Sequence, residues 1–158
     1  MPSFTIHLAV AKKYLELHPE ENQEQFYNGV IDPDLKDKTT SHFGPNSSSV
    51  DLNKYCQEVG LETSYNRGYF MHLLTDYLFY NKFLERFSKE VYDDYDKINK
   101  TLIKKYNLQI PEKVKDKVKF TEGETKILNL ENICKFIEAV GSLELDGYVE
   151  EKQGIEVE

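Results

Sequence analysis

The sequence predicts an all-α protein, a helical bundle built around one buried central helix. Residues 68–87 carry apolar side chains on every side and, after Gly68, contain neither proline nor glycine, which is typical of a helix inside a bundle. Flanking segments repeat apolar residues at the 3.6-residue period of an amphipathic helix. Strand-like sequence is found at residues 118–127, where we expect a small β-hairpin around Glu122 and Gly123.

The first two helices are expected at residues 3–18 and 20–28. Ser3 is a good N-cap for the first helix, and Pro19 ends its pattern. Gly29 follows the second helix in the usual position of a C-terminal cap.

A polar loop is expected after the second helix. Pro33 restricts Asp32 to an extended backbone, so Asp32 and Asp34 should flank a stiff turn, where capping of the turn is their simplest role. Phe43 directly after His42 indicates that this loop returns to the core.

The remaining elements follow from caps and apolar periodicity. We expect a helix from Asp51 to Glu58, the central helix from about Ser64 to Phe87, and helices at Ser88–Tyr106, Pro111–Lys117 and Glu131–Val140. Arg67, near the start of the central helix, is expected to be solvated or paired with a carboxylate. Residues 1–151 are expected to form a single domain, and residues 152–158 an acidic, flexible tail.

Composition restricts the partners of the protein. The formal net charge of −8 argues against nucleic acid and anionic membrane surfaces as partners. No apolar run approaches the length of a membrane span, and the first residues lack a secretory signal, so we expect a cytoplasmic protein without membrane insertion. Cys56 and Cys134 are then expected to be free thiols. The sequence carries no signal for the oligomeric state.

Two polar residues interrupt the apolar central helix. His72 and Asp76 are four residues apart and therefore share one face. Burial of an unpaired carboxylate is costly, so a histidine, a lysine or a metal ion should meet Asp76. His7 lies in the apolar arc of the first helix, where it is either a hydrogen-bonded core histidine or part of the same site.

Imidazole and carboxylate together form a ligand set for zinc or a similar divalent ion. His7, Asp34, His42, His72 and Asp76 are therefore the candidate metal ligands. A His-x₃-Asp pair alone is weak evidence, and the prediction depends on convergence of all five residues in the folded chain.

Four motifs carry a family resemblance: Phe4-Thr5-Ile6-His7, Gly29-Val30-Ile31-Asp32-Pro33-Asp34, Ser41-His42-Phe43 and Gly68-Tyr69-Phe70-Met71-His72-Leu73-Leu74-Thr75-Asp76. In order and spacing they resemble the zinc-dependent phospholipase C family, whose superfamily includes single-strand-specific nucleases. The resemblance covers residues 4–87. It implies an α-helical bundle around a cluster of zinc ions that hydrolyses phosphodiesters.

The resemblance also implies how ions would be held. Asp34, His42, His72 and Asp76 resemble the complete ligand set of one zinc ion, and His7 resembles a ligand of a second, with Asp76 bridging both. The sequence departs from the family by having no tryptophan and no histidine after His72, so the ligands of a third ion are missing. One or two ions are therefore expected.

Two functions compete. The first is a metal-dependent phosphoesterase that hydrolyses a small phosphoester, with Asp32 or Asp34 as the general base. The second is a non-catalytic helical protein that retains the metal for structure or ligand binding. A His-Asp-type phosphohydrolase is weaker, because no His-Asp dipeptide occurs.

Three tyrosines lie near the face of His72 and Asp76 along the predicted central helix. Tyr65, Tyr69 and Tyr80 are close enough on that helix to line a pocket for an apolar or aromatic substrate group, although packing is the simpler role for each.

Overall fold

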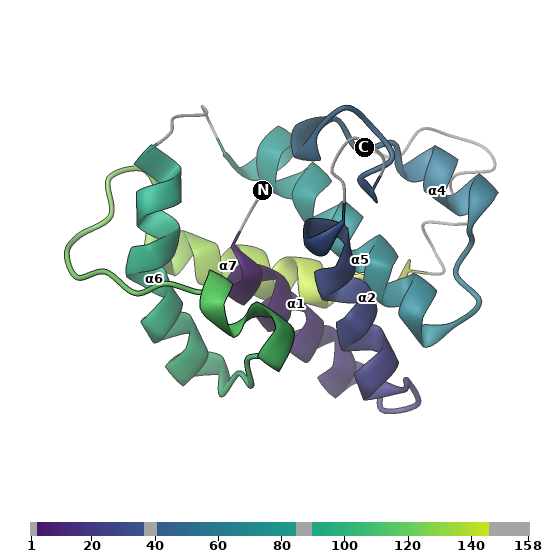
Figure 1. Ribbon diagram of the computed structural model, residues 1–158, viewed down its shortest axis with the longest axis horizontal. Helices are drawn as coiled ribbons and strands as arrows, with labels where there is room; N and C mark the ends of the chain where they lie inside the picture. Colours follow the sequence, from purple (N-terminus) through teal and green to yellow (C-terminus); the bar gives the residue numbers. More distant parts are fainter. Residues whose placement is uncertain (1–2, 37–40, 85–89, 146–158) are drawn as a thin grey trace.

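Figure 1 shows a computed structural model of the chain, which describes residues 3–36, 41–84 and 90–145. Within these ranges the protein is all-α and has no strand. The helices are α1 (Phe4–Leu17), α2 (Gln23–Leu35), α4 (Leu52–Glu58), α5 (Ser64–Leu78), α6 (Glu90–Tyr106) and α7 (Leu130–Gly141), with 3₁₀ turns η1 (Ser47–Ser49) and η3 (Glu112–Lys117) and a π-helical turn η2 (Phe79–Phe83). The predicted fold class is confirmed.

Local capping sets the starts of three helices, each within one residue of the predicted start. The side chains of Ser3, Asp51 and Thr63 each accept a backbone N–H from the first turn of α1, α4 and α5. Gly60 has a φ of +89°, a conformation that glycine adopts without strain, in the bend between α4 and α5.

α1 and α5 together form the centre of the bundle. α1 contacts α2, α5, α6 and α7, and its residues from Phe4 to Ala11 are all buried. α5 is buried over most of its length and pairs most extensively with α2 (Figure 1). α1 therefore shares the central position with α5.

The predicted end of the second helix at Gly29 is wrong, because α2 continues to Leu35. Gly29 instead lies where α2 crosses α5. A Cβ on Gly29 would come 2.1 Å from the carbonyl oxygen of Tyr65, and a Cβ on Gly68 would come 2.1 Å from that of Phe26. The two glycines therefore allow the two backbones to approach closely, which explains the extensive pairing of α2 with α5.

The stiff turn predicted around Pro33 is also wrong. Pro33 lies inside the last turn of α2, with Asp32 and Asp34 on either side of it. The helix ends where the Lys36 N–H donates to the Asp32 carbonyl at 3.2 Å. Because a helix turns about 100° per residue, side chains two residues apart point roughly 200° apart. Asp32 and Asp34 therefore face different surroundings.

The regular central helix is shorter than predicted. It ends at Leu78, and a π-helical turn follows in which the Leu84 N–H donates to the Phe79 carbonyl at 2.8 Å. The Asn81 side chain also donates to the carbonyls of Tyr77 and Ser48. Leu84 is extended, which stops the helical path. The predicted end at Phe87 and the cap at Ser88 lie outside the described residues.

The β-hairpin predicted at 118–127 is absent from the described structure, where this stretch is an irregular segment between η3 and α7 (Figure 1). Its backbone groups are bound by α6 instead of pairing with one another. The Asp94 carboxylate accepts the N–H groups of residues 126–128 at 2.7–2.9 Å, and the Asp96 carbonyl accepts that of Thr121 at 3.1 Å. Hydrogen bonds from these backbone N–H groups to the buried Asp94 carboxylate thus take the place of the hydrogen bonds between two strands.

Three further predictions concern the ends of the chain and its chemistry. Cys56 and Cys134 are not joined in a disulfide, as expected. Among the described residues, no helix combines the length and the hydropathy needed to cross a bilayer. The predicted flexible tail at residues 152–158 lies outside the described residues.

Candidate metal centre

The five candidate ligands come from four parts of the chain and meet in the core. α1 contributes His7, the last turn of α2 contributes Asp34, and α5 contributes His72 and Asp76. His42 comes from the segment between α2 and η1. The five side chains are 0–1% exposed.

Asp76 lies between the three histidines. Its Oδ1 is 3.0 Å from His7 Nε2, and its Oδ2 is 3.2 Å from both His42 Nε2 and His72 Nε2. Asp34 Oδ1 is 3.2 Å from His42 Nε2 and 3.5 Å from His72 Nε2. The rings of His7 and His72 stack with centroids 3.7 Å apart.

These contacts have the spacing of ligands around a shared ion. The Nε2 atoms of all three histidines and both oxygens of Asp34 and Asp76 are buried without a hydrogen-bond partner. In a tetrahedral zinc site with bonds of about 2.0–2.1 Å, ligand atoms lie about 3.3–3.4 Å apart. The observed distances of 3.0–3.5 Å match that edge length. His7, His72 and Asp76 form one group that could hold a metal ion, and Asp34, His42 and His72 form another.

Two of the histidines are oriented through their other ring nitrogen. His72 Nδ1 lies 2.6 Å from the carbonyl oxygen of Val30, and His42 Nδ1 lies 2.9 Å from Ser41 Oγ. Because Ser41 Oγ donates to the Pro33 carbonyl at 2.8 Å, it accepts from His42. Nε2 of each ring therefore faces the carboxylates and, in the neutral ring, is available to a metal ion, the arrangement found around bound metals. Ser41 directly precedes His42 in the sequence, a signal that could have indicated this role.

The two buried carboxylates of the cluster favour positive charge on the groups around them. Burial alone would lower the pKa of His72, but the Asp34 and Asp76 carboxylates raise it to about 10. The same two carboxylates outweigh burial and raise the pKa of His42. Burial and the charge of His72 lower the pKa of His7. Two buried carboxylates are thus balanced either by protons on His72 and His42 or by a cation.

The negative charge of Asp76 is not balanced by well-formed hydrogen bonds. Burial alone would raise the pKa of Asp76, but the charges of His72 and His7 hold it well below its usual range. Neither oxygen of Asp76 has a hydrogen-bond partner, even though the histidine nitrogens lie within 3.2 Å. In each of the two groups that could hold a metal ion, the metal-binding atoms lie within 4.8 Å of one another, an arrangement that suits a cation.

Asp32, the other candidate general base, lies outside both metal-binding groups. Tyr65 donates to Asp32 Oδ2 at 2.6 Å, and Lys113 Nζ is 3.7 Å from Oδ1. Of the three tyrosines expected near the site, Tyr69 is buried and donates to the Ser41 carbonyl at 2.6 Å. Tyr69 therefore stabilises the segment that carries His42, and Tyr65 stabilises the last turn of α2.

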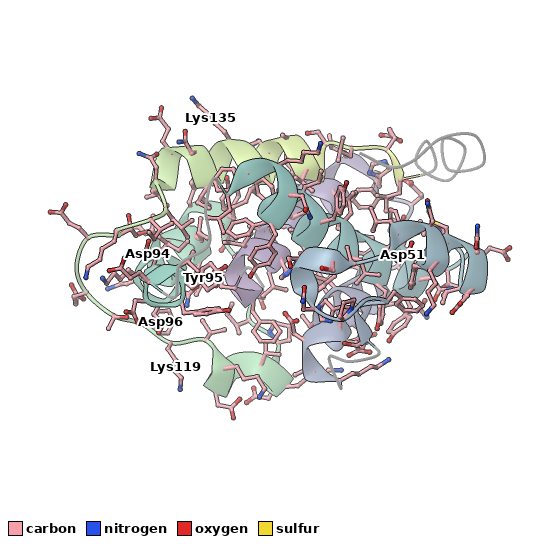
Figure 2. The ribbon with its side chains drawn as sticks, turned by 90° about the horizontal axis from the view of Figure 1, so that it is seen from above. Asp51, Asp94, Tyr95, Asp96, Lys119 and Lys135 are labelled. Carbon is pink, nitrogen blue, oxygen red and sulfur yellow. The ribbon has the colours of Figure 1, made fainter. Side chains whose placement is uncertain are left out.

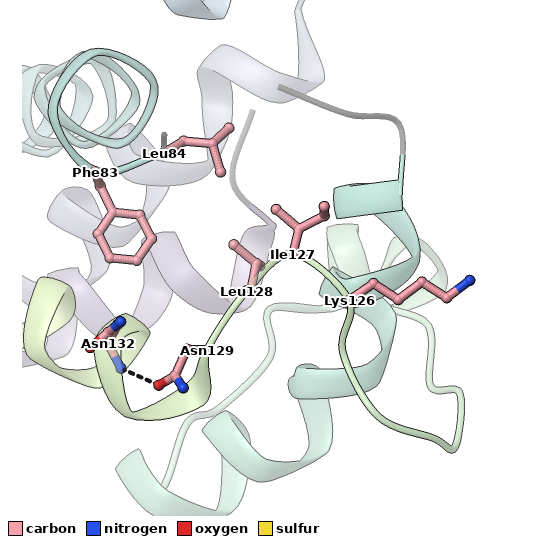
Figure 3. A pocket seen from close by; sticks show the side chains of 7 residues that line it. All are labelled: Phe83, Leu84, Lys126, Ile127, Leu128, Asn129 and Asn132. Atoms are coloured by element: carbon pink, nitrogen blue, oxygen red, sulfur yellow. Dashed lines mark hydrogen bonds between the residues drawn. The ribbon is translucent and has the colours of Figure 1, made fainter. Parts of the chain in front are cut away.

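A cavity of about 340 Å³ lies beside the cluster and includes Asp34 in its wall. Tyr92 and Tyr95 of α6 line it, whereas Tyr65, Tyr69 and Tyr80 do not. Tyr95 belongs to the buried face of α6, together with Val91 and Ile98, and the sequence gave no sign that it would lie at this site. A second cavity, shown in Figure 3 between Phe83 and Asn132, is lined by none of the five candidate ligands.

Comparison of the chain with models of protein families, with curated proteins and with solved structures found no match. The resemblance to the zinc-dependent phospholipase C family therefore rests on the four sequence motifs alone.

Proposed function

We propose that the chain is a zinc-dependent phosphoesterase related to the zinc-dependent phospholipase C family. The observation that supports this most is the convergence of five buried His and Asp residues whose metal-binding atoms lack hydrogen-bond partners. Asp34, His42, His72 and Asp76 Oδ2 would hold one ion. His7 and Asp76 Oδ1 would hold a second.

A divalent ion held there would lower the pKa of a water molecule and polarise a phosphoryl oxygen. Asp34 is the ligand that also reaches the cavity wall. Its Oδ1 is the oxygen close to His42 and His72, which leaves Oδ2 to accept the proton of the attacking water. Asp32 is bound by Tyr65 and is assigned a role in positioning α2.

The cavity of about 340 Å³ is at the small end of ligand pockets, which favours a small phosphoester over a polymer. The net charge of −8 likewise disfavours nucleic acid. Two cysteines that form no disulfide suit a reducing compartment, and we therefore propose a cytoplasmic location.

A structural metal site is the second candidate. The specific observation in its favour is burial, because all five ligand side chains are 0–1% exposed. In that case the metal would stabilise the fold without turnover, and the cavity beside Asp34 would bind nothing.

Elemental analysis of the purified protein tests the metal site. We expect one or two zinc ions per chain, and a lower melting temperature after chelation, because a ligand that binds only the folded state stabilises it. His42→Ala should lose zinc. His18→Ala is the matched control, since His18 lies outside the cluster and contacts the Tyr14 carbonyl and Glu144. A protein that is metal-free as purified and insensitive to added zinc would contradict the proposal.

Hydrolysis of chromogenic phosphomonoesters and phosphodiesters with zinc, manganese or magnesium separates the two candidates. The phosphoesterase should show turnover that His42→Ala loses and His18→Ala keeps. Zinc binding without turnover under any of these conditions would favour the structural site. Activity that survives His42→Ala would come from a contaminant.

A further inference from the structure

The cavity beside Asp34 contains a polar group that the fold leaves unsatisfied. Tyr95 is 5% exposed, and its hydroxyl is buried without a hydrogen-bond partner. A buried tyrosine hydroxyl normally finds a partner, because leaving it unpaired costs free energy. Tyr95 lines the same cavity as Asp34, so a ligand in that cavity could supply the missing acceptor.

The surroundings of Tyr95 hold its ring in place. The ring contacts Phe79 with centroids 6.3 Å apart and Tyr92 with centroids 5.9 Å apart. In Figure 2, Tyr95 lies between Asp94 and Asp96 on α6, with Lys119 below them. Burial and the charges of Tyr92, Asp76 and Asp34 all raise the pKa of Tyr95, so its hydroxyl stays protonated. It can therefore donate a hydrogen bond to an anion.

The edge of the cavity differs from its interior. Tyr92 is 46% exposed and lines the cavity, so an aromatic face is available to a bound molecule. Lys117 and Lys119 also line it and are exposed, which places two positive charges around the opening. Asp34 and Asp96 also line the cavity, so the two lysines offset two carboxylates. The Tyr95 donor, the lysines and the Tyr92 ring together suit an anionic group attached to an aromatic or apolar one.

We propose that this cavity is the substrate pocket for phosphoesters of aromatic or apolar alcohols. The Tyr95 hydroxyl donates a hydrogen bond to a phosphoryl oxygen, and the Tyr92 ring packs on the alcohol group. This assignment rests on the proposed function, and it makes Tyr95 a binding residue contributed by α6, a helix that carries none of the five candidate metal ligands.

Calorimetric titration of the zinc-loaded protein with phenylphosphonate and methylphosphonate, which are not hydrolysed, tests the pocket. Tyr95→Phe removes only the hydroxyl and should weaken both ligands by roughly tenfold or more, as expected for a hydrogen bond to a charged group. Tyr92→Ala should weaken phenylphosphonate by about fivefold and leave methylphosphonate unchanged. Zinc content and melting temperature should not change in either variant.

Tyr106→Phe is the matched control, because Tyr106 is on the same helix, its hydroxyl donates to Glu138, and it does not line the cavity. Unchanged phosphonate affinity in Tyr95→Phe would overturn the assignment, and so would loss of zinc from that variant, which would make Tyr95 a support of the metal site. The titration is repeated on metal-free protein. If the wild-type protein takes up no zinc but binds phosphonate, and Tyr95→Phe weakens that binding, the pocket stands and the proposed function is rejected. If neither the zinc-loaded nor the metal-free protein binds phosphonate, the pocket is rejected.

Discussion

At the scale of single residues, Asp76 is the carboxylate that lies close to all three histidines of the cluster. Its two oxygens face different histidines, with Oδ1 toward His7 and Oδ2 toward His42 and His72. It is completely buried, so no water can replace these contacts at its surface. Asp76 thus connects His7 with His42 and His72. Loss of this carboxylate should weaken metal binding more than loss of His7 alone.

Asp76→Asn should therefore lower the zinc content further than His7→Ala does. The amide keeps the shape of the side chain but loses the negative charge that attracts the cation. Elemental analysis of both variants measures the difference, with Asp93→Asn on the exposed face of α6 as the control. Equal zinc contents in Asp76→Asn and the wild-type protein would show that Asp76 is not a ligand.

At the scale of elements, the crossing of α2 and α5 positions the site. Asp34 is on α2, whereas His72 and Asp76 are on α5, so the separation of the two helices sets the distances within the cluster. That separation depends on Gly29 and Gly68, which leave no room for a Cβ.

Gly29→Ala separates helix propensity from packing. Alanine in a helix is favoured over glycine by about 1 kcal/mol, so propensity alone would stabilise the variant. Its Cβ would come 2.1 Å from the Tyr65 carbonyl oxygen, and such overpacking costs typically about 1–3 kcal/mol. We expect a net loss of stability in chemical denaturation, together with weaker zinc binding. Gln25→Ala, at an exposed position of α2, should be neutral or slightly stabilising; a stabilised Gly29→Ala would show that the crossing is not close.

At the scale of the whole molecule, Glu21 connects three helices. Its carboxylate accepts from Arg67 at 2.6 and 2.7 Å and from Ser64 at 2.6 Å, both on α5, and from Tyr14 of α1 at 3.1 Å. It lies directly before α2. The expected pairing of Arg67 with a carboxylate is thus confirmed, and the partner lies 46 residues away in the sequence.

The pH dependence of stability should report this connection. Burial alone would raise the pKa of Glu21, but Arg67, Ser64 and Tyr14 lower it below its ordinary value of 4.5. A lowered pKa in the folded state gives stability that is present above pH 4.5 and is lost as the pH falls through the folded value. Glu21→Gln should cost on the order of 2 kcal/mol at pH 7, as for hydrogen bonds to a charged group, and the difference from wild type should shrink below pH 4.5. Denaturation curves at pH 7 and pH 3.5 measure it; a constant difference would contradict the assignment.

Local information in the sequence was sufficient for the fold class and for most helix starts. Caps such as Ser3, Asp51 and Thr63 act within one turn, so the sequence around them determines where a helix begins. The spacing of His72 and Asp76 likewise fixes their common face of α5 without reference to the rest of the chain. These features could be predicted because the residues that interact are neighbours in the sequence.

Features that depend on distant partners were decided only by the tertiary structure. Gly29 suits a helix cap and a close helix crossing equally well, because both need the absence of a Cβ, and only the position of α5 distinguishes them. The expected hairpin is absent from the described residues, and Asp94 instead accepts backbone N–H groups 32–34 residues away. The helical path through Pro33 separated Asp34 from Asp32, and the packing of α6 brought Tyr95 to the cavity beside Asp34. The sequence by itself determined which residue types could bind a metal; the crossing of the helices decided which of their atoms meet, because contacts between elements depend on the path of the whole chain.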